Sequence, residues 1–311
     1  MTFDQAATAT RDKLKSDAEK AKKPWGERHT KQWLQNILDH ASPTLGAKRV
    51  GYVTHTDIYN ALEPIWQSQG PTAAKVLERI GMIMSWAKAT GRRTGDNPVN
   101  EARILLGKQL HETQHNPAIP FPEIPAFYQR IDDLEETPAV KLALRCLILN
   151  ASRPAEVRLA KVSEIDLQNA SWEIPGERMK SRKPHRIPLS VEALAVVREA
   201  LNLHRTGEYL FPGQKPAAPI HRDALLVAIK RAGYEATSHG CRSSFRDWVR
   251  EASTFEDALA EAALAHKLKD RTVRSYARGT LFEKRREMMA AWAEFLTGTN
   301  ANVIEFKKAE A

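Results

Sequence analysis

Cysteine is scarce in this chain: positions 146 and 241 hold the two cysteines among 311 residues. Two thiols are too few for a disulfide framework or a zinc site of their own, so a reducing, cytoplasmic location is expected. No apolar run reaches the length of a membrane span. The first twenty residues, MTFDQAATATRDKLKSDAEK, are polar and carry acids, so the sequence indicates no secretory signal and no membrane partner.

Negative charge is also in short supply. The chain has 38 aspartates and glutamates against 47 lysines and arginines, which gives a net charge of +9 and a pI of about 9.5. Its hydrophobic content of 42% is ordinary for a soluble globular protein, and its length allows two domains with separate cores. A basic balance favours a polyanionic partner, and nucleic acid is the first to consider.

Residues 1 to about 106 show helical periodicity and no strand pattern of any length. Apolar side chains recur at helical spacing in 31–41, 55–70 and 72–91, and Gly91 is typical of a helix end. Basic pairs lie at the ends of these elements and are either solvated or placed to contact phosphate. These pairs are Lys22 with Lys23, Lys48 with Arg49, and Arg92 with Arg93.

Prolines concentrate between His111 and Phe127, in HETQHNPAIPFPEIPAF. Four of them, at 117, 120, 122 and 125, predict an extended segment without a regular element. We therefore place a domain boundary here. The predicted division is a helical domain at 1–110, a linker at 111–126, a second domain at 127–297 and a tail at 298–311.

The second domain has a mixed pattern. Thr137 is a predicted cap and Pro138 the first residue of an almost wholly apolar core helix. The runs SWEIP, RMKS and HRIPL are short and β-compatible, which predicts a small antiparallel sheet. Further helices are expected at 191–204, 221–232, 239–252, 254–264 and 282–296.

One predicted helix begins with two polar side chains that share a face. In SHGCRSSFRDWVRE, residues 238–251, the apolar residues fall at helical spacing and predict one buried side. His239 and Arg242 then lie three residues apart and are neighbours on the helix surface. An isolated H-x-x-R pair is more often a solvated polar face, so a functional interpretation needs partners elsewhere in the chain.

Three further stretches supply such partners. LNASRPAEVRLA places Arg153 at a helix start, with proline at the first helical position and Glu156 at the third. WEIPGERMKSRKPHRIPLS places Lys180 within the predicted β-structure. The stretch that begins LAHKLKDRTVRSYARGT carries His266 and, ten residues later, Tyr276. A metal site is not indicated, because the two histidines lack carboxylates or thiolates at ligand spacing.

With these motifs in this order, nearly the whole chain resembles the tyrosine recombinases of the phage integrase family. The R-M-K … H-x-I-P-L-S stretch and the R-R-x-M-M-x-x-W-A helix are similar to those of satellite-phage and genomic-island integrases. The resemblance implies a multidomain fold, with an all-α core-site DNA-binding domain before a mixed α+β, mainly helical catalytic domain. Two departures are mild: Ala151-Ser152 replaces Thr-Gly, and L-A-H replaces L-G-H.

The resemblance also implies the role of each candidate residue. Tyr276 would be the nucleophile, Glu156 a supporting acid, and the other catalytic residues would be Arg153, Lys180, His239, Arg242 and His266. These residue types suit an anionic phosphodiester, because arginines stabilise charge on its oxygens and a histidine accepts the phenol proton. Lysine can protonate the departing 5′-oxygen, so no metal or other cofactor is required.

The implied activity is that of a site-specific recombinase, which integrates or excises a mobile element through a 3′-phosphotyrosyl intermediate. The implied partners are double-stranded attachment-site DNA, three further copies in a tetramer, and an excisionase or host DNA-bending protein. A type IB topoisomerase and a DNA-binding protein without catalysis are the alternatives. Relatives usually carry an N-terminal arm-binding domain, so we expect a naturally short or a truncated member. Residues 303–306 are expected to form a strand that pairs with the small sheet, and a disordered tail is the alternative.

Overall fold

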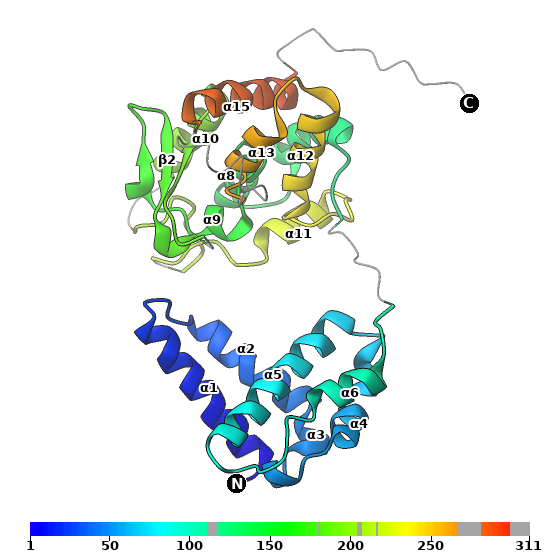
Figure 1. The fold of residues 1–311 in the computed structure, drawn as a ribbon. Coiled ribbons are helices and arrows are strands. Elements are labelled where there is room, and N and C mark those ends of the chain that lie inside the picture. The colour runs from blue at the N-terminus through cyan, green and yellow to red at the C-terminus, as the bar shows by residue number, and fades with distance from the viewer. Residues whose placement is uncertain (111–116, 180, 204–206, 216, 267–280, 299–311) are drawn as a thin grey trace, which may run out of the picture. The chain divides into compact units, whose positions relative to one another are not determined.

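The computed structural model describes the chain except for residues 111–116, 180, 204–206, 216, 267–280 and 299–311. It divides into two compact units, Met1–Gln114 and His115–Ala311 (Figure 1). Among the described residues, none of the helices combines the length and the apolar character that crossing a bilayer requires. The boundaries predicted at 110, 126 and 297 stay predictions.

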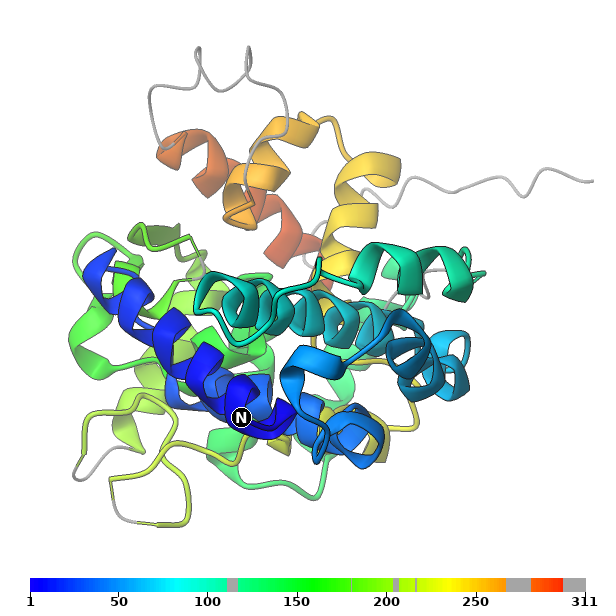
Figure 2. The same cartoon turned by 60° about the horizontal axis from the view of Figure 1, so that its bottom comes forward.

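The first unit is built from helices, as the periodicity predicted, and appears in blue to cyan in Figure 2. They are α1 (Phe3–Lys20), α2 (Glu27–His40), α3 (Ser42–Leu45), α4 (His55–Trp66), α5 (Gly70–Ala89) and α6 (Val99–Leu106), with a 3₁₀ turn at Val50–Tyr52. Capping boxes at Thr2 and Thr54 begin α1 and α4. Their apolar faces meet in one core, which includes Trp33, Ile58 and Ile80.

The basic pairs of this unit do not share one role. Arg93 donates through Nη1 to the carbonyls of Val50, Gly51 and Val53, at 3.3, 3.2 and 2.8 Å. Its guanidinium therefore holds the turn after α3, and the proposed contact of the basic pairs with phosphate stays a prediction. Lys48 forms an ion pair with Asp57.

The second unit combines helices with a small sheet, which lies at one side of it in Figure 1. Its helices are α7 (Ile124–Arg130), α8 (Pro138–Leu149), α9 (Pro154–Arg158), α10 (Val191–Asn202), α11 (Ala224–Arg231), α12 (Gly240–Ala252), α13 (Asp257–Ala263) and α15 (Phe282–Thr297). The strands β1 (Ile165–Asp166), β2 (Ser171–Ile174) and β3 (His185–Pro188) form an antiparallel sheet in that order. The 3₁₀ turns are Phe121–Glu123, Ile131–Asp133, Val162–Glu164 and Gly176–Arg178.

The core of this unit confirms the predicted apolar faces. The side chain of Thr137 caps α8, and nearly every residue of that helix is buried. Trp292 of α15 is fully buried and donates from Nε1 to the carbonyl of Ile148, at 2.9 Å. From α12, Phe245 packs edge-on against the same ring and Trp248 packs at a tilt, with centroids 5.4 and 5.1 Å away. These contacts join α8, α12 and α15.

Two local predictions were wrong. The proline-rich stretch is helical at its end, in the turn Phe121–Glu123 and in α7. Pro122 and Pro125 lie in the first turn of these elements, where no backbone donor is needed, so they do not break them. The RMKS run is not a strand at its described residues, because Arg178 ends a 3₁₀ turn. The strand predicted at 303–306 lies outside the described residues.

Candidate active site

The start of α9 places one arginine against one carboxylate, as the sequence predicted. Arg153 is the N-cap residue, and its backbone N–H donates to Oε2 of Glu156, at 2.8 Å. Its Nη1 also donates to Oε1 of the same carboxylate, at 2.7 Å. Glu156 is buried, whereas the Arg153 side chain is 22% exposed. The guanidinium is therefore oriented by a carboxylate beneath it and still reaches solvent.

The start of α12 places a second, buried arginine. His239 is the N-cap residue, and Gly240 packs against the carbonyl of Pro117, where a Cβ atom would collide. Arg242 is 4% exposed. It donates from Nη1 to the carbonyl of Ala151, at 2.5 Å, and from Nη2 to the carbonyl of Leu264, at 2.8 Å. Both of these acceptors are uncharged carbonyl groups, so they do not neutralise the guanidinium.

The two arginines converge on one atom. Nη2 of Arg153 also donates to the carbonyl of Leu264, at 3.2 Å. This oxygen follows α13, so residues that are far apart in the sequence meet at one carbonyl, and both α9 and α12 contact α8. Burial, followed by repulsion from Arg153, lowers the pKa of Arg242 to about 10. Two cations thus share a buried site with one carboxylate, Glu156, and the site favours an anion.

His266 completes the described cluster. Its Nδ1 lies 3.1 Å from Oε2 of Glu261, and its Nε2 lies 3.3 Å from Nη2 of Arg242. Ala265 has a φ of 50°, a region that glycine occupies without strain, and glycine is common at this position of the L-G-H pattern. The sharp turn aims the ring back at α12.

Burial and the same cations favour the neutral form of the nearby imidazoles. Burial, then Arg242 and Arg153, lower the pKa of His266 to about 4. Burial and the same two arginines lower the pKa of His239. A neutral imidazole can accept a proton at neutral pH. Among the described residues, no group of three or more His, Cys, Asp or Glu side chains is arranged to hold a metal ion.

Lys180 and Tyr276 lie outside the described residues. The residues just before Lys180 are nevertheless tied to the cluster. Arg178 donates from Nη2 to the carbonyl of Glu156, at 2.6 Å, and its Nη1 forms an ion pair with Glu164. This anchor was missed from the sequence, although its position two residues before a candidate lysine was a usable signal.

Two further residues at the cluster were also missed. His185 of β3 lies with Nε2 3.1 Å from the carbonyl of Ala263, and burial followed by Arg285 lowers its pKa to about 4. It is the histidine of the H-x-I-P-L-S motif, to which no role was given. Glu261 was missed because an acid five residues before a histidine matches no helical contact spacing.

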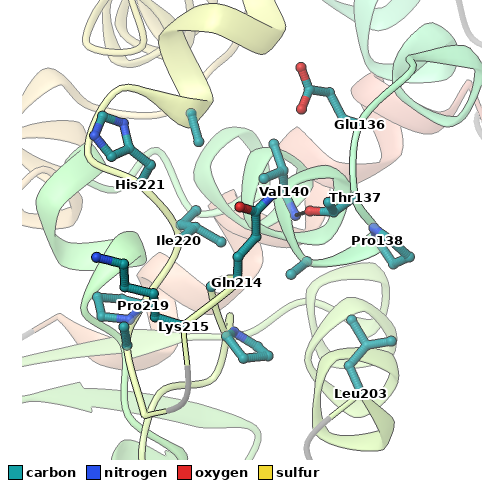
Figure 3. A pocket seen from close by; sticks show the side chains of 15 residues that line it. Glu136, Thr137, Pro138, Val140, Leu203, Gln214, Lys215, Pro219, Ile220 and His221 are labelled. Carbon is teal, nitrogen blue, oxygen red and sulfur yellow. Dashed lines mark hydrogen bonds between the residues drawn. The ribbon is translucent and has the colours of Figure 1, made fainter.

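A pocket of about 680 Å³ lies elsewhere in the second unit (Figure 3). It is bounded by the start of α8, the end of α10, the loop around Pro219 and the start of α11. Its lining is mostly apolar and includes Val140, Leu203 and Ile220. It contains none of the candidate site residues, so it is not part of the cluster.

Comparison with known proteins gives the same family that the sequence motifs implied. A phage integrase central domain model matches residues 15–103, and the phage integrase family model matches residues 119–281. Prophage integrases IntZ and IntA of Escherichia coli (strain K12) are each 31% identical to the chain, over 287 and 273 residues. These matches cover 90% and 84% of the chain, and 70% and 63% of the two relatives.

The solved structures that resemble the chain have the same fold. A lambda integrase dimer bound to a core site superposes with a TM-score of 0.66 at 18% identity, over 86% of this chain and 96% of that one. The Tn1549 transposon integrase in complex with circular intermediate DNA has a TM-score of 0.61 at 15% identity, over 93% and 99%. The chain belongs to the phage integrase family and is a tyrosine recombinase, as the sequence motifs had implied.

Proposed function

We propose that this chain cleaves and rejoins duplex DNA at specific sites and thereby integrates or excises a mobile element. One observation carries the proposal: Arg153 and Arg242 meet at the carbonyl of Leu264, with Glu156 as the buried carboxylate beside them. The unbalanced positive charge suits a phosphodiester. Forked guanidinium donors match its non-bridging oxygens and stabilise the charge that builds on them during attack.

In the proposed reaction, the phenol oxygen of Tyr276 attacks the phosphorus and the bond to the 5′-oxygen breaks. The phenol proton passes to a histidine of the cluster, whose neutral state is favoured by burial and by the neighbouring arginines, which lower its pKa. Lys180 supplies the proton that the departing 5′-oxygen takes up. The 3′-phosphotyrosyl ester retains the energy of the broken bond, and the 5′-hydroxyl of a second DNA end reverses the step.

The proposed partners are duplex attachment sites and further copies of the chain. A lambda integrase tetramer bound to a Holliday junction shares this fold, with a TM-score of 0.66 at 17% identity. We propose a similar tetramer here, in which an excisionase or a host DNA-bending protein sets the direction of the reaction.

A nicked duplex tests the proposal. Its sequence is first selected by repeated rounds of binding from a random pool, and the nick lets the short 5′ product diffuse away. The wild-type chain should then accumulate a covalent protein–DNA adduct. Tyr276→Phe should form none and still bind, because it loses only the hydroxyl. Tyr209→Phe, a phenol away from the cluster, is the control that should retain the adduct.

Each alternative gives a different result. A DNA-binding protein without catalysis retains the duplex and forms no adduct. A type IB topoisomerase forms the adduct but reseals only the duplex that it cut. A recombinase also joins the adduct to the 5′-hydroxyl of a second duplex, which is detected as a strand of new length.

The role of Lys180 has its own test. Lys180→Ala should slow cleavage by roughly 10²–10⁴-fold, the usual contribution of a general acid. A duplex with sulfur at the bridging 5′ position should restore the rate, because a thiolate leaves without a proton. Lys183→Ala is the matched control and should cleave both duplexes normally. Equal loss on both duplexes with Lys180→Ala would assign Lys180 another role.

A further inference from the structure

The ring of His266 lies between one group that only donates and one that only accepts. A guanidinium has no acceptor, so Nε2, at 3.3 Å from Nη2 of Arg242, must accept. An ionised carboxylate has no donor, so Nδ1, at 3.1 Å from Oε2 of Glu261, must carry the proton. The two contacts together select one neutral tautomer, with the proton on Nδ1.

We propose that Glu261 is a positioning residue for proton transfer, which fixes the tautomer of His266 so that Nε2 presents its lone pair to the arginine cluster. This deepens the proposed function and rests on it. When Nε2 takes up the phenol proton, it gives up its hydrogen bond from Arg242, and the ring becomes an imidazolium whose Nδ1–H already points at a carboxylate. A partner of this kind both orients the ring and stabilises the charge that forms on it.

The comparison between the two histidines of the cluster favours His266 as the proton acceptor. Within the described part of the chain, no carboxylate lies within ion-pairing distance of the His239 ring, whereas His266 has Glu261. His239 would therefore gain a proton without a compensating charge in contact.

Glu261 is itself held in place. It forms an ion pair with Arg246 of α12, and Nη2 of Arg246 lies 3.1 Å from Oδ2 of Asp257 at the start of α13. This leaves a purely structural alternative, in which Glu261 only ties α13 to α12. Asp257 makes the same tie without touching His266, so it provides a matched control.

The charges around His266 come from three elements. Helix α12 contributes Arg242 and Arg246, with His239 at its start. The start of α9 contributes Arg153 and Glu156, and α13 contributes Glu261. Burial, followed by the arginines, lowers the pKa of the ring to about 4. The ring is therefore neutral at pH 7, where its tautomer is a defined and measurable property.

Nuclear magnetic resonance of the full chain, labelled with ¹⁵N-histidine, reads the tautomer directly at pH 7. The signals of His266 are identified by their loss in His266→Gln. The wild-type and Asp257→Asn proteins should show a protonated Nδ1 and an unprotonated Nε2. In Glu261→Ala the two nitrogen shifts should move towards each other, because the ring exchanges between tautomers. A protonated Nε2 in the wild type, or unchanged shifts in Glu261→Ala, would overturn the proposal.

Cleavage of the selected nicked duplex gives the second readout. Glu261→Ala should slow adduct formation by roughly tenfold to a hundredfold, as loss of a carboxylate behind a functional histidine does at metal sites. DNA retention should be unchanged, and Asp257→Asn should cleave within about twofold of wild type. Glu261→Gln, which preserves the packing, replaces Glu261→Ala if the latter does not fold.

The two proposals fail in different ways. If the wild-type chain forms no adduct, the proposed function is wrong, while the tautomer measurement still stands by itself. If the wild type forms the adduct and Glu261→Ala is no slower than Asp257→Asn, Glu261 serves only to join the two helices.

Discussion

Helix α12 carries three arginines at four-residue intervals, and each has a different environment. Arg242 is almost fully buried, and the acceptors recorded for it are two carbonyls and an imidazole. Arg246 pairs with the carboxylates of Asp257 and Glu261. Arg250 is 53% exposed, and within the described part of the chain its ion pair is with Asp257. Residues four apart lie on the same side of a helix, so the difference arises from what packs against that side.

This comparison shows that position along one helix decides what an arginine does. At the start of α12, burial and the neighbouring Arg153 disfavour the charged form of Arg242, and both lower its pKa. Two turns later, hydrogen bonding to Asp257 raises the pKa of Arg250. The first environment is suited to an external anion, and the second has already satisfied its charge within the chain.

The largest expected effect separates Arg242 from Arg246. Arg242→Ala should slow adduct formation on the nicked duplex by about 10²–10³-fold, the usual cost of losing one donor that stabilises developing charge. Many phosphates are contacted but one is cleaved, so retention of the duplex should change little. Arg242→Lys should recover only part of the rate, because an ammonium lacks the forked donors.

Arg246→Ala is the matched control from the same helix. Its cleavage rate should fall less than that of Arg242→Ala, because the charge of Arg246 is paired with Glu261 and Asp257 and acts on His266 without a hydrogen bond to the ring. Equal losses in rate for both variants would show that the two environments are not functionally different, and the comparison would fail.

The sequence identified one of these three arginines, Arg242, together with other residues of the cluster. The motifs identified Arg153, Glu156, His239, Arg242 and His266, and the structure brings these five together. The helix starts were predictable because proline, capping residues and apolar periodicity act locally. The α12 face containing Phe245 and Trp248 was predicted for the same reason.

What the sequence could not give depends on contacts between distant segments. Glu261 reaches His266 only because the chain turns sharply at Ala265. Arg178 reaches the carbonyl of Glu156 across 22 residues of sequence. The helix at Ile124–Arg130 was missed because prolines were interpreted as breakers, although the first turn of a helix tolerates them.

A smaller expected effect extends the comparison to Arg285 of α15. Like Arg242, it is buried and donates to a carbonyl, that of Arg186, and burial lowers its pKa to about 10. Burial and then Arg285 lower the pKa of His185 from 6.5 to about 4. Below pH 6.5 the unfolded chain binds a proton at this residue and the folded chain does not. The free energy of unfolding therefore decreases as the pH is lowered.

The loss attributable to His185 should begin near pH 6.5, reach up to about 3 kcal/mol and level off below about pH 4. Urea unfolding of the wild type and His185→Gln at pH 7 and at pH 4.5 measures it. The glutamine variant should lose less stability between the two values, because other groups titrate alike in both proteins. An equal loss would mean that His185 is readily protonated in the folded chain.

The smallest effect is expected at the far end of α12. Nε and Nη2 of Arg250 lie 3.1 and 3.2 Å from the two oxygens of Asp257, but both side chains are 53% exposed. Water screens such a pair, so Arg250→Ala should lower the free energy of unfolding by less than about 1 kcal/mol. The difference should shrink further in 1 M salt, where charges are screened within about 3 Å.

Urea unfolding at low and high salt measures both quantities, and cleavage of the nicked duplex by Arg250→Ala should match wild type. A loss of cleavage comparable to that of Arg242→Ala would show that charge at the exposed end of α12 also serves the reaction, and the division of this helix into an anion-binding start and a neutralised end would be wrong.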